Sequence, residues 1–237
     1  MRICYSRASA PSAHNIADIL MEQGVDVQLV KGPNGDINWG RASTNATLNA
    51  DISNVTNKRR MRELFAEHEV PMPRLIRTTD NIFPIVGRPD RHTRGRGFWL
   101  CHNVLDVVKA KNGITYRNGK RKQPATHFME YISKERAPRE YRVHVFLGKS
   151  IRVSQKLFNE SGEYTTIKPE RDLVKHVRKA AKKAVEAVGL DFGTVDVLAN
   201  DTECWVLEVN SAPGVGGSMP RLWARVFKEY MEGEWDE

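Results

Sequence analysis

Two acidic side chains and one amide stand at short intervals in an otherwise apolar stretch near the C-terminus. Residues 190–214 read LDFGTVDVLANDTECWVLEVNSAPG, with Asp196 flanked by valines and with Glu208 and Asn210 two positions apart. An ionised carboxylate in a buried strand is costly unless a partner compensates its charge. Oxygen ligands of this kind suit a hard cation such as Mg²⁺, whose shell is usually completed by water and phosphate oxygens. The alternative is that these side chains face solvent at strand ends or pair with arginines.

The two apolar runs that carry these groups are expected to form adjacent strands. They cover Thr194–Leu198 and Cys204–Val209, and the turn between them lies at 199–202. Because side chains alternate along a strand, the second run is expected to present two faces. On this pattern Trp205, Leu207 and Val209 share one face, and Val206, Glu208 and Asn210 share the other.

A segment rich in glycine and arginine is a second candidate for chemistry. Gly95, Arg96 and Gly97 follow Arg88 in a loop that contains two further arginines. Glycines let backbone amides approach an anion closely, and arginines supply positive charge. The segment does not match the P-loop pattern. It also fits a solvated basic hairpin or a loop that grips nucleic-acid phosphates.

Two further groups of charged residues lie next to expected strands. Glu130, Tyr131 and Ile132 end one strand, and Glu140 and Arg142 open the next. Arg142 has mostly apolar and aromatic neighbours, so its charge needs an anionic partner. That partner is either a phosphoryl group or a carboxylate of the protein in a structural salt bridge.

Composition and charge are those of a globular protein with an acidic partner. The chain has 237 residues, 40% of them hydrophobic and 28% charged, and its net charge is +8, with basic residues spread along the chain. This balance favours nucleotides, nucleic acid or acidic peptides without choosing among them.

No run approaches the ~20 apolar residues of a membrane helix, and no signal-peptide pattern opens the chain, which predicts a cytoplasmic protein. The three separated cysteines predict buried, reduced thiols.

Hydrophobic periodicity predicts α/β units in three successive parts of the chain, 1–53, 54–126 and 127–237. The first reads as a short βαβ unit, and the other two combine helices with strands. The expected helices cover 11–23, 58–69, 172–188 and 220–231. In addition to the pair described above, the expected strands cover 3–5, 25–30, 82–88, 97–101, 114–116, 128–132, 141–147 and 151–157.

The order of these motifs resembles the ATP-grasp superfamily, most closely its RimK-like peptide-ligase branch, over residues 54–217. The family's Asp/Asn-Lys helix start is matched by Asn57-Lys58, and its V-P-x-P exit by 70–73. Its basic strand end and Gly-rich loop are similar to 85–88 and 95–97. Its Glu-aromatic-Ile hinge, acidic-x-Arg strand and closing G-V-D and LEVN-S-x-P-G motifs look like 130–132, 140–142, 194–196 and 207–214.

This resemblance implies an ATP-grasp fold, in which two α+β lobes (54–126 and 127–237) clasp ATP and a short Rossmann-like domain (1–53) precedes them. It also implies roles for individual residues. Asp196, Glu208 and Asn210 would hold Mg²⁺, with Mn²⁺ as an alternative ion. Lys58 and Arg88 would contact phosphates beneath the loop of Gly95, Arg96 and Gly97.

Glu130, Tyr131 and Ile132 would line the adenine pocket, and Glu140 would reach the ribose. Arg142 would face the transferred phosphoryl group, with Lys156 near the reacting carboxylate.

The activity implied by the resemblance is ATP-dependent ligation of a carboxylate to an amine through an acyl phosphate, with release of ADP and phosphate. One alternative is an ATP-grasp kinase that phosphorylates a hydroxyl or another acceptor. The other is a non-enzymatic, basic nucleic-acid-binding module.

Two departures from the family pattern affect what the resemblance implies. Arg88 stands where most relatives have lysine, and the unit 1–53 is short for a domain that usually helps shape the acceptor site. The expected partners are a carboxylate and an amine, with an acidic peptide or another macromolecule among the candidates, and no membrane. Substrate identity, nucleic-acid binding and self-association stay open.

Overall fold

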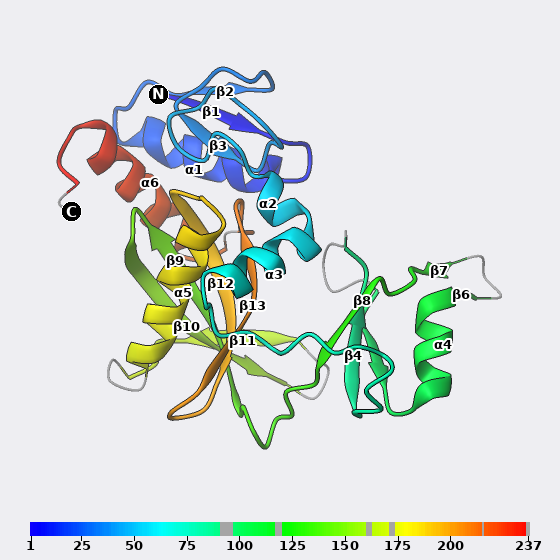
Figure 1. Ribbon diagram of the computed structural model, residues 1–237. Helices are drawn as coiled ribbons and strands as arrows, with labels where there is room; N and C mark the ends of the chain where they lie inside the picture. Colours follow the sequence, from blue (N-terminus) through cyan, green and yellow to red (C-terminus); the bar gives the residue numbers. More distant parts are fainter. Residues whose placement is uncertain (91–96, 117–119, 160–162, 171–173, 215, 236–237) are drawn as a thin grey trace.

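The computed structural model describes residues 1–90, 97–116, 120–159, 163–170, 174–214 and 216–235, which form a mixed α/β protein. Figure 1 shows an N-terminal unit in blue, a five-stranded sheet next to it, and a smaller lobe in green to one side. Among the described residues, no helix has the length and apolar character needed to cross a membrane. Cys4 and Cys101 are buried as expected, whereas Cys204 is half-buried, and all three thiols are free.

The N-terminal unit is built on a three-stranded parallel sheet in the order β2-β1-β3. Its elements are β1 (Arg2–Tyr5), α1 (Ala10–Glu22), β2 (Gln28–Val30) and β3 (Ile37–Trp39). The expected βαβ unit is confirmed, and β3 is an additional strand that was not expected. The helix α1 lies beside the C-terminal helix α6 (Met219–Met231), so the two ends of the chain pack together (Figure 1).

The five-stranded sheet is antiparallel throughout, in the order β11-β10-β9-β12-β13. Its strands are β9 (Arg139–Phe146), β10 (Lys149–Phe158), β11 (Tyr164–Ile167), β12 (Phe192–Ala199) and β13 (Cys204–Asn210). One face packs against α5 (Lys175–Ala187) and α3 (Lys58–Glu67) in a core that includes Tyr141, Val143 and Val195. On the opposite face, Phe146 and Phe192 pack against Trp223 and Phe227 of α6.

Because side chains alternate along a strand, those of β9 divide between the two faces of the sheet. Tyr141, Val143 and Val145 face the helices, whereas the residues between them face the other way. Arg142 lies at the end of this second face where polar groups collect, and Phe146 lies at the aromatic end. One face of the sheet thus carries both a polar site and the apolar contacts that fix the sheet against α6.

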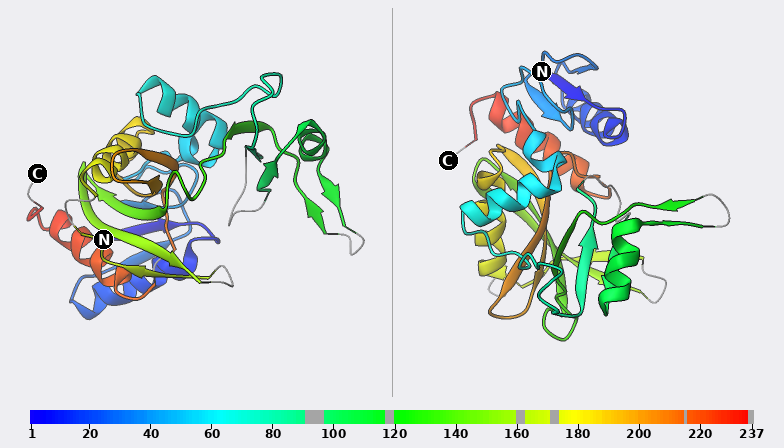
Figure 2. Two further views of the ribbon diagram at one scale, coloured as in Figure 1. Left: turned by 90° about the horizontal axis from the view of Figure 1, so that it is seen from below. Right: turned by 45° about the vertical axis from the view of Figure 1, so that its right-hand side comes forward.

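The smaller lobe has its own sheet and core. Its strands are β4 (Ile85–Arg88), β5 (Trp99–Cys101) and β8 (His127–Glu130), in the antiparallel order β5-β4-β8. The helix α4 (Val104–Asn112) packs on β5, and β6 (Ile114–Thr115) pairs with β7 (Arg121–Lys122) as a ribbon that projects from the lobe (Figure 2).

The chain reaches the smaller lobe through α2 (Ser53–Thr56) and α3, which lie in the core of the five-stranded sheet rather than in that lobe. The core of the smaller lobe consists instead of side chains from Ile76 to Phe128. The domain boundaries expected at residues 54 and 127 remain predictions.

The expectation of strict alternation along β13 is wrong. The ladder pairs Asp196 with Glu208 but Val197 with Val206, so a β-bulge accommodates Leu207 as an extra residue. As a result Val206 packs in the core on the helical side, while Leu207 and Glu208 both line a cavity on the other side. The bulge shifts the phase of the strand by one residue, which the sequence pattern does not reveal.

Candidate active site

A cavity of about 800 Å³ lies between the five-stranded sheet and the sheet of the smaller lobe. Its walls come from α3, β4, β8, β9, β10, β12 and β13, so residues far apart in the sequence meet there. Most of the residues singled out from the sequence line it, namely Lys58, Arg88, Glu130, Tyr131, Ile132, Glu140, Arg142, Lys156, Asp196, Glu208 and Asn210.

The glycine-rich loop is only partly visible. Gly95 and Arg96 lie outside the described residues. Gly97 is described, but it does not line the cavity. Its φ is +77°, and a Cβ there would come within 2.7 Å of the ring of Pro89, so glycine is required at this position for backbone reasons. Its backbone conformation thus explains the glycine without reference to a ligand.

The two carboxylates and the amide are neighbours on the paired strands β12 and β13. Asp196 and Glu208 are directly opposite one another, and Asn210 stands opposite Thr194. The Asn210 side chain donates to Glu208 Oε1 at 3.2 Å, which brings the amide and the carboxylate together. Two carboxylates and an amide oxygen on one wall are an all-oxygen donor set, which fits a hard cation such as Mg²⁺.

No group of three or more His, Cys, Asp or Glu side chains that could hold a metal ion occurs among the described residues. A cation on this wall therefore needs ligands from outside the carboxylate and imidazole set, such as the Asn210 amide, water and a phosphate. This requirement is typical of Mg²⁺, which seldom occupies a site built from protein side chains alone.

Asp196 is held in a charge network on the buried side of the cavity. Arg142 donates from Nε to Oδ1 at 2.9 Å and from Nη2 to Oδ2 at 3.0 Å, a bidentate pair. Lys156 Nζ lies 3.1 Å from the same Oδ1 and also forms an ion pair with Glu140. Burial alone raises the pKa of Asp196, but the hydrogen bonds and charges of Arg142 and Lys156 outweigh it and leave the pKa below its ordinary value. The sequence left open that an arginine pairs with this carboxylate, and Arg142 is such a partner.

The opposite side of the cavity is formed by the N-terminus of α3. The side chain of Asn57 caps this helix by accepting from the backbone N–H groups of Arg59 and Arg60. The cap places Lys58 at the start of the helix, where its Nζ lies 3.4 Å from Glu208 Oε2. Burial lowers the pKa of Arg88, with Glu208 acting in the opposite direction. Glu208 thus lies within the field of two cations that come from different elements.

The end of the cavity next to the connection between the lobes is apolar. Val86 and Met129 of the smaller lobe face Leu198 and Leu207 of the large sheet across it, and Ile132 closes the connecting segment. Ile132 packs with Ala137 and Trp205 in a small cluster of its own. A cavity with one apolar end and one charged end suits a ligand that combines a flat apolar ring with anionic groups.

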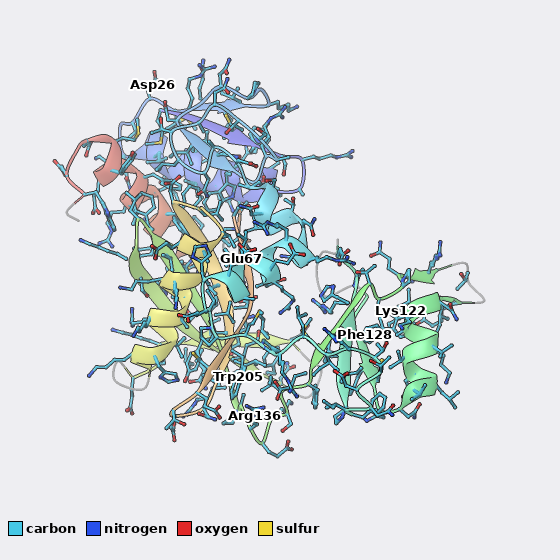
Figure 3. The ribbon with its side chains drawn as sticks, in the orientation of Figure 1. Asp26, Glu67, Lys122, Phe128, Arg136 and Trp205 are labelled. Atoms are coloured by element: carbon cyan, nitrogen blue, oxygen red, sulfur yellow. The ribbon has the colours of Figure 1, made fainter. Side chains whose placement is uncertain are left out.

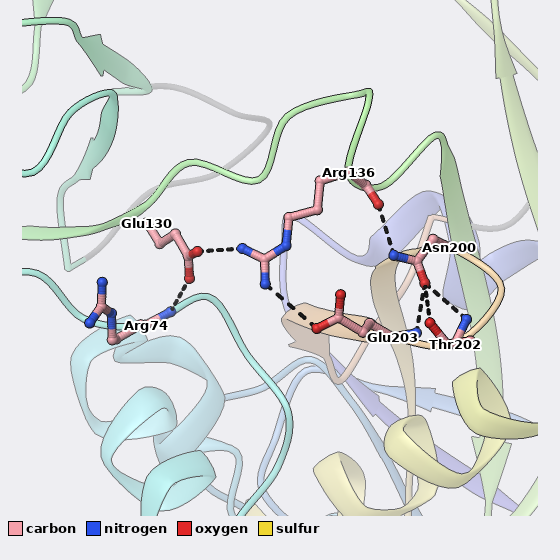
Figure 4. A network of polar contacts seen from close by, with 6 residues as sticks. All are labelled: Arg74, Glu130, Arg136, Asn200, Thr202 and Glu203. Carbon is pink, nitrogen blue, oxygen red and sulfur yellow. Dashed lines mark hydrogen bonds and ion pairs between the residues drawn. The ribbon is translucent and has the colours of Figure 1, made fainter.

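The carboxylate of Glu130 does not point freely into this apolar end. It accepts from Arg136 Nη1, and the backbone N–H of Arg74 lies 3.4 Å from its Oε2 (Figure 4). Arg136 also lies 3.6 Å from Glu203 and stacks over the ring of Trp205 at 4.5 Å. Glu130 therefore connects the smaller lobe to the large sheet through a guanidinium.

Two cavity residues with ionisable side chains, Arg62 and His127, were not identified from the sequence. Arg62 lies one helical turn after Lys58, a spacing that places both on one face of α3 and that could have identified it. Its side chain is 6% exposed, and its Nη2 donates to the carbonyl of Leu207 at 3.2 Å. Burial, and next the charge of Arg88, lowers the pKa of Arg62 to about 10, although Glu208 opposes the shift.

A second cavity of about 710 Å³ adjoins the first and shares Lys58 and Asn210 with it. Its far wall belongs to the N-terminal unit and includes Ser6, Ser9 and Gly40. A Cβ on Gly40 would come within 2.7 Å of Ala212, so the chain passes close to the large sheet at this point. The two cavities together connect all three parts of the molecule.

No protein-family model matches the chain, and no curated protein is significantly similar to it. Several solved structures share its fold. D-alanine–D-alanine ligase from Bacillus anthracis matches with a TM-score of 0.66 at 14% identity, over 98% of this chain and 96% of that chain. The same ligase in complex with ATP matches with a TM-score of 0.63 at 14% identity, over 90% and 86% of the two chains.

The ATP-grasp ligase PsnB, solved with a minimal precursor, matches with a TM-score of 0.64 at 13% identity, over 96% of this chain and 98% of that chain. Identities this low establish the fold and no more. The fold of the chain therefore matches that of ATP-grasp ligases over nearly its whole length, as expected from the sequence. The parallel sheet at its N-terminus agrees with the short Rossmann-like unit expected there.

Proposed function

We propose that this protein is an ATP-dependent carboxylate–amine ligase of the RimK-like kind, which forms an amide and releases ADP and phosphate. The observation that carries the proposal is the pairing of Asp196 with Glu208 across β12 and β13, beside five cationic side chains and an apolar pocket. The ligases that share this fold were solved with ATP in one case, and with a precursor, Mg and ADP in the other. Both facts support a site for a magnesium nucleotide in this cavity.

In this proposal the nucleotide spans the length of the cavity. The adenine ring occupies the apolar end, next to Tyr131 and Ile132, and Glu140 lies within reach of the ribose. The phosphates lie near Lys58 and Arg88, and Gly95, Arg96 and Gly97 are the residues expected to bind them in addition. Because Arg88 presents a planar fork where a lysine presents a single charge, it is suited to a two-point contact with one phosphate.

Asp196, Glu208 and Asn210 are the residues that would hold Mg²⁺, or Mn²⁺ in its place. When bound, the ion supplies positive charge to the phosphate oxygens. In the protein itself, Arg142 and Lys156 form ion pairs with Asp196, and Lys58 forms one with Glu208. These pairs hold the carboxylates in place and keep Asp196 ionised before any ligand arrives.

The chemistry proposed here balances in two steps. A carboxylate oxygen of the first substrate attacks the γ-phosphorus, and the bond to ADP breaks, which leaves an acyl phosphate. The amine nitrogen of the second substrate then attacks the acyl carbon, and phosphate leaves as the nitrogen loses a proton. Arg142 and Lys156, fixed by Asp196 and Glu140, provide preorganised charge against the transferred group.

The second cavity is the proposed place for the acceptor substrate. It opens to the first cavity at Lys58 and Asn210, and its outer wall belongs to the N-terminal unit. Hydroxyl groups and small side chains dominate that wall, so it offers hydrogen bonds rather than a strong charge. A carboxylate, an amine or the end of an acidic peptide are the partners considered for it.

The test is ADP release from MgATP with pools of amino acids and peptides, for the wild-type protein and for Glu208→Gln. We expect release to require both a carboxylate and an amine, and to fall about 100-fold or more in the variant because an anionic ligand of the Mg²⁺ that would neutralise the phosphates is lost. Glu232→Gln, at the exposed residue that follows α6, is the matched control and should release ADP normally.

Three other outcomes would each replace the proposal. Near-normal ADP release by Glu208→Gln would show that this wall of the cavity takes no part in the reaction. Release that needs a single hydroxyl acceptor would make the protein a kinase. Salt-sensitive nucleic-acid binding that survives loss of Asp196 and Glu208, in a protein that does not bind ATP, would make it a binding module.

A further inference from the structure

The net positive charge of the chain is concentrated in the smaller lobe. Residues 76–128 contain eleven Lys and Arg against three Asp and Glu, whereas the rest of the chain contains 26 of each. Basic residues occur along the whole sequence, but over the rest of the chain acidic residues equal them in number. A lobe with such an excess of positive charge attracts anionic partners over a distance of about 10 Å at moderate salt.

The cavity does not account for all of this charge. Arg88 lines it, but α4 and the β6–β7 ribbon lie at the outer end of the lobe, away from the large sheet (Figures 1 and 2). Their described cations are Lys109, Lys111, Lys120, Arg121 and Lys122. Lys122 stacks over the ring of Trp99 at 3.9 Å and is labelled above α4 in Figure 3.

The same end of the lobe exposes aliphatic side chains. Val107 and Ala110 of α4 are buried against the lobe, whereas Val104 is 52%, Leu105 70% and Val108 50% exposed. At 100° per residue these three side chains occupy the arc of the helix opposite the buried pair, together with Lys109. The helix α4 therefore packs one apolar stripe against the core of its lobe and exposes a second stripe to solvent. The exposed stripe is a surface available for contact with a partner.

We propose that the outer face of this lobe, formed by Val104, Leu105, Val108 and Lys109 of α4 and by the ribbon that follows α4 in the chain, with Lys120 and Arg121, binds an acidic peptide segment that also carries aliphatic side chains. The apolar stripe supplies the buried contacts, and the cations of α4 and the ribbon select an acidic partner and set its orientation. The site is separate from the cavity, so binding does not depend on the proposed ligase activity.

Two other occupants fit the same face less well. A second copy of this chain would place one strongly basic lobe against another, and like charges at an interface oppose association. A nucleic acid would use the cations and the exposed ring of Tyr116 next to the ribbon, but it has no surface that buries three adjacent aliphatic side chains. Charge complementarity together with the aliphatic stripe therefore favours an acidic peptide.

The experiment is a fluorescence-anisotropy titration of the full chain with three labelled probes. The first is a helical peptide with leucine on one face and glutamate on the other, the second is polyglutamate of equal length, and the third is oligothymidylate. Leu105→Ser combined with Val108→Ser removes two of the three aliphatic side chains of the stripe without changing the charge. Both side chains are at least half exposed, so the fold should tolerate the change, and the thermal midpoint of unfolding checks this.

We expect the amphipathic peptide to bind more tightly than polyglutamate, and the double serine variant to weaken peptide binding about tenfold while leaving polyglutamate unchanged. Lys109→Glu combined with Arg121→Glu should weaken binding of both. Lys182→Glu combined with Lys179→Glu, on the solvated side of α5, changes the net charge equally and should leave peptide binding nearly unchanged.

Each of the remaining results would overturn the proposal. Peptide binding that is absent, that ignores the serine substitutions, or that responds equally to the α5 control would show that this face is not the site. Oligothymidylate that binds more tightly than the peptide and ignores the serine substitutions would assign the face to nucleic acid.

Discussion

At the scale of single residues, the cavity contains charges that stability alone does not explain. Asp196 is 7% exposed and lies against both Arg142 and Lys156, while Lys156 also bonds to Glu140. A buried ion pair seldom stabilises a fold more than apolar side chains of equal volume would, because its desolvation cost is large. Carboxylates and cations assembled at the wall of a cavity are instead typical of a site that holds charge in place for a ligand.

Arg62 provides the clearest case at this scale. Its Nε and Nη1 are buried without a hydrogen-bond partner among the described residues. We expect Arg62→Met to raise the free energy of unfolding by about 1–3 kcal/mol, because two unsatisfied donors and a buried charge are removed. ATP affinity should fall about tenfold, because a cation beside Arg88 is lost. Urea unfolding and titration calorimetry measure the two effects.

Arg59→Met is the matched control, since Arg59 belongs to the same helix but is largely exposed and pairs with Asp90. It should change the free energy of unfolding by no more than about 0.5 kcal/mol and leave ATP affinity unchanged. An Arg62→Met protein that is less stable and binds ATP normally would show that Arg62 has a structural role instead.

His144 gives a prediction for pH. Burial, and next the charges of Arg142 and Arg152, lowers the pKa of His144 to about 3, so the folded protein keeps this ring neutral. The unfolded chain binds the proton below about pH 6.5, so this residue costs stability as the pH falls from 6.5 toward 3, at about 1.4 kcal/mol per pH unit. We expect His144→Phe to remove about 2 kcal/mol of the stability lost between pH 6.5 and 5. Urea unfolding at both pH values measures the difference.

Phenylalanine suits this position because the ring of His144 packs against Trp223, with 5.8 Å between the ring centres. Asp196 does not interfere with the measurement. Its pKa lies below its ordinary value, so its contribution to stability is lost only at lower pH. Identical pH dependence in the wild-type and variant proteins would contradict the low pKa of His144.

At the scale of elements, periodicity predicted the long helices well and the small elements poorly. The helices α1, α3, α5 and α6 follow the expected ranges within a few residues, because each has a regular apolar stripe that the core requires. The helix α4 was missed because its apolar residues face both ways. Its capping pattern, in which Asn103 accepts from the backbone N–H of Asp106, could have revealed it.

The candidate site illustrates both what sequence can predict and what it cannot. Residue types and spacing identified Asp196, Glu208 and Lys58, because buried charges in apolar elements are conspicuous. The bulge at Leu207 and the contact between Glu130 and Arg136 depend on how strands register and how the two lobes meet. Interactions of this kind join residues that no local pattern relates.

The connection between the two lobes allows a prediction about how these elements are held together. Arg136 links Glu130 of the smaller lobe with Glu203 and Trp205 of the large sheet (Figures 3 and 4). It is partly exposed, so Arg136→Ala should change the free energy of unfolding by less than about 1 kcal/mol. We expect its loss to free Glu130 and loosen the apolar end of the cavity, which should weaken ATP binding about threefold to tenfold. Calorimetric titration with ATP measures the change.

Arg225→Ala is the control for this prediction, because it breaks a pair with Glu229 on the exposed side of α6. It should leave ATP binding unchanged. Lys at position 136 keeps the charge but loses the planar contact with Trp205, so Arg136→Lys should restore part of the affinity. Equal ATP affinities in wild type and Arg136→Ala would show that the guanidinium does not position the lobes.

At the scale of the whole molecule, the N-terminal unit is fixed to the large sheet through aromatic and polar contacts. Trp39 stacks on Phe192 with 5.6 Å between ring centres and meets Trp223 edge-on at 5.5 Å. Asn49 supplies the polar contact: its side chain donates to the carbonyl of Phe192 at 2.9 Å and accepts from the backbone N–H of Asp191 at 2.8 Å. Since this unit forms one wall of the second cavity, its attachment bears on the proposed acceptor site.

Asn49 is therefore the residue through which the arrangement of the whole molecule can be tested. It is 1% exposed and has a φ of +57°, a conformation that asparagine and glycine tolerate better than alanine. We expect Asn49→Ala to lower the free energy of unfolding by about 3 kcal/mol, and Asn49→Gly by about 1 kcal/mol less, because glycine avoids the backbone strain but not the loss of hydrogen bonds. Asn45→Ala, at an exposed asparagine of the same segment, should have little effect. In both Asn49 variants ATP should still bind while acceptor-dependent ADP release falls, because the cavity proposed for the nucleotide lies between the other two parts of the molecule. ADP release that remains at the wild-type rate in a destabilised Asn49 variant would separate the N-terminal unit from the reaction and place the acceptor elsewhere.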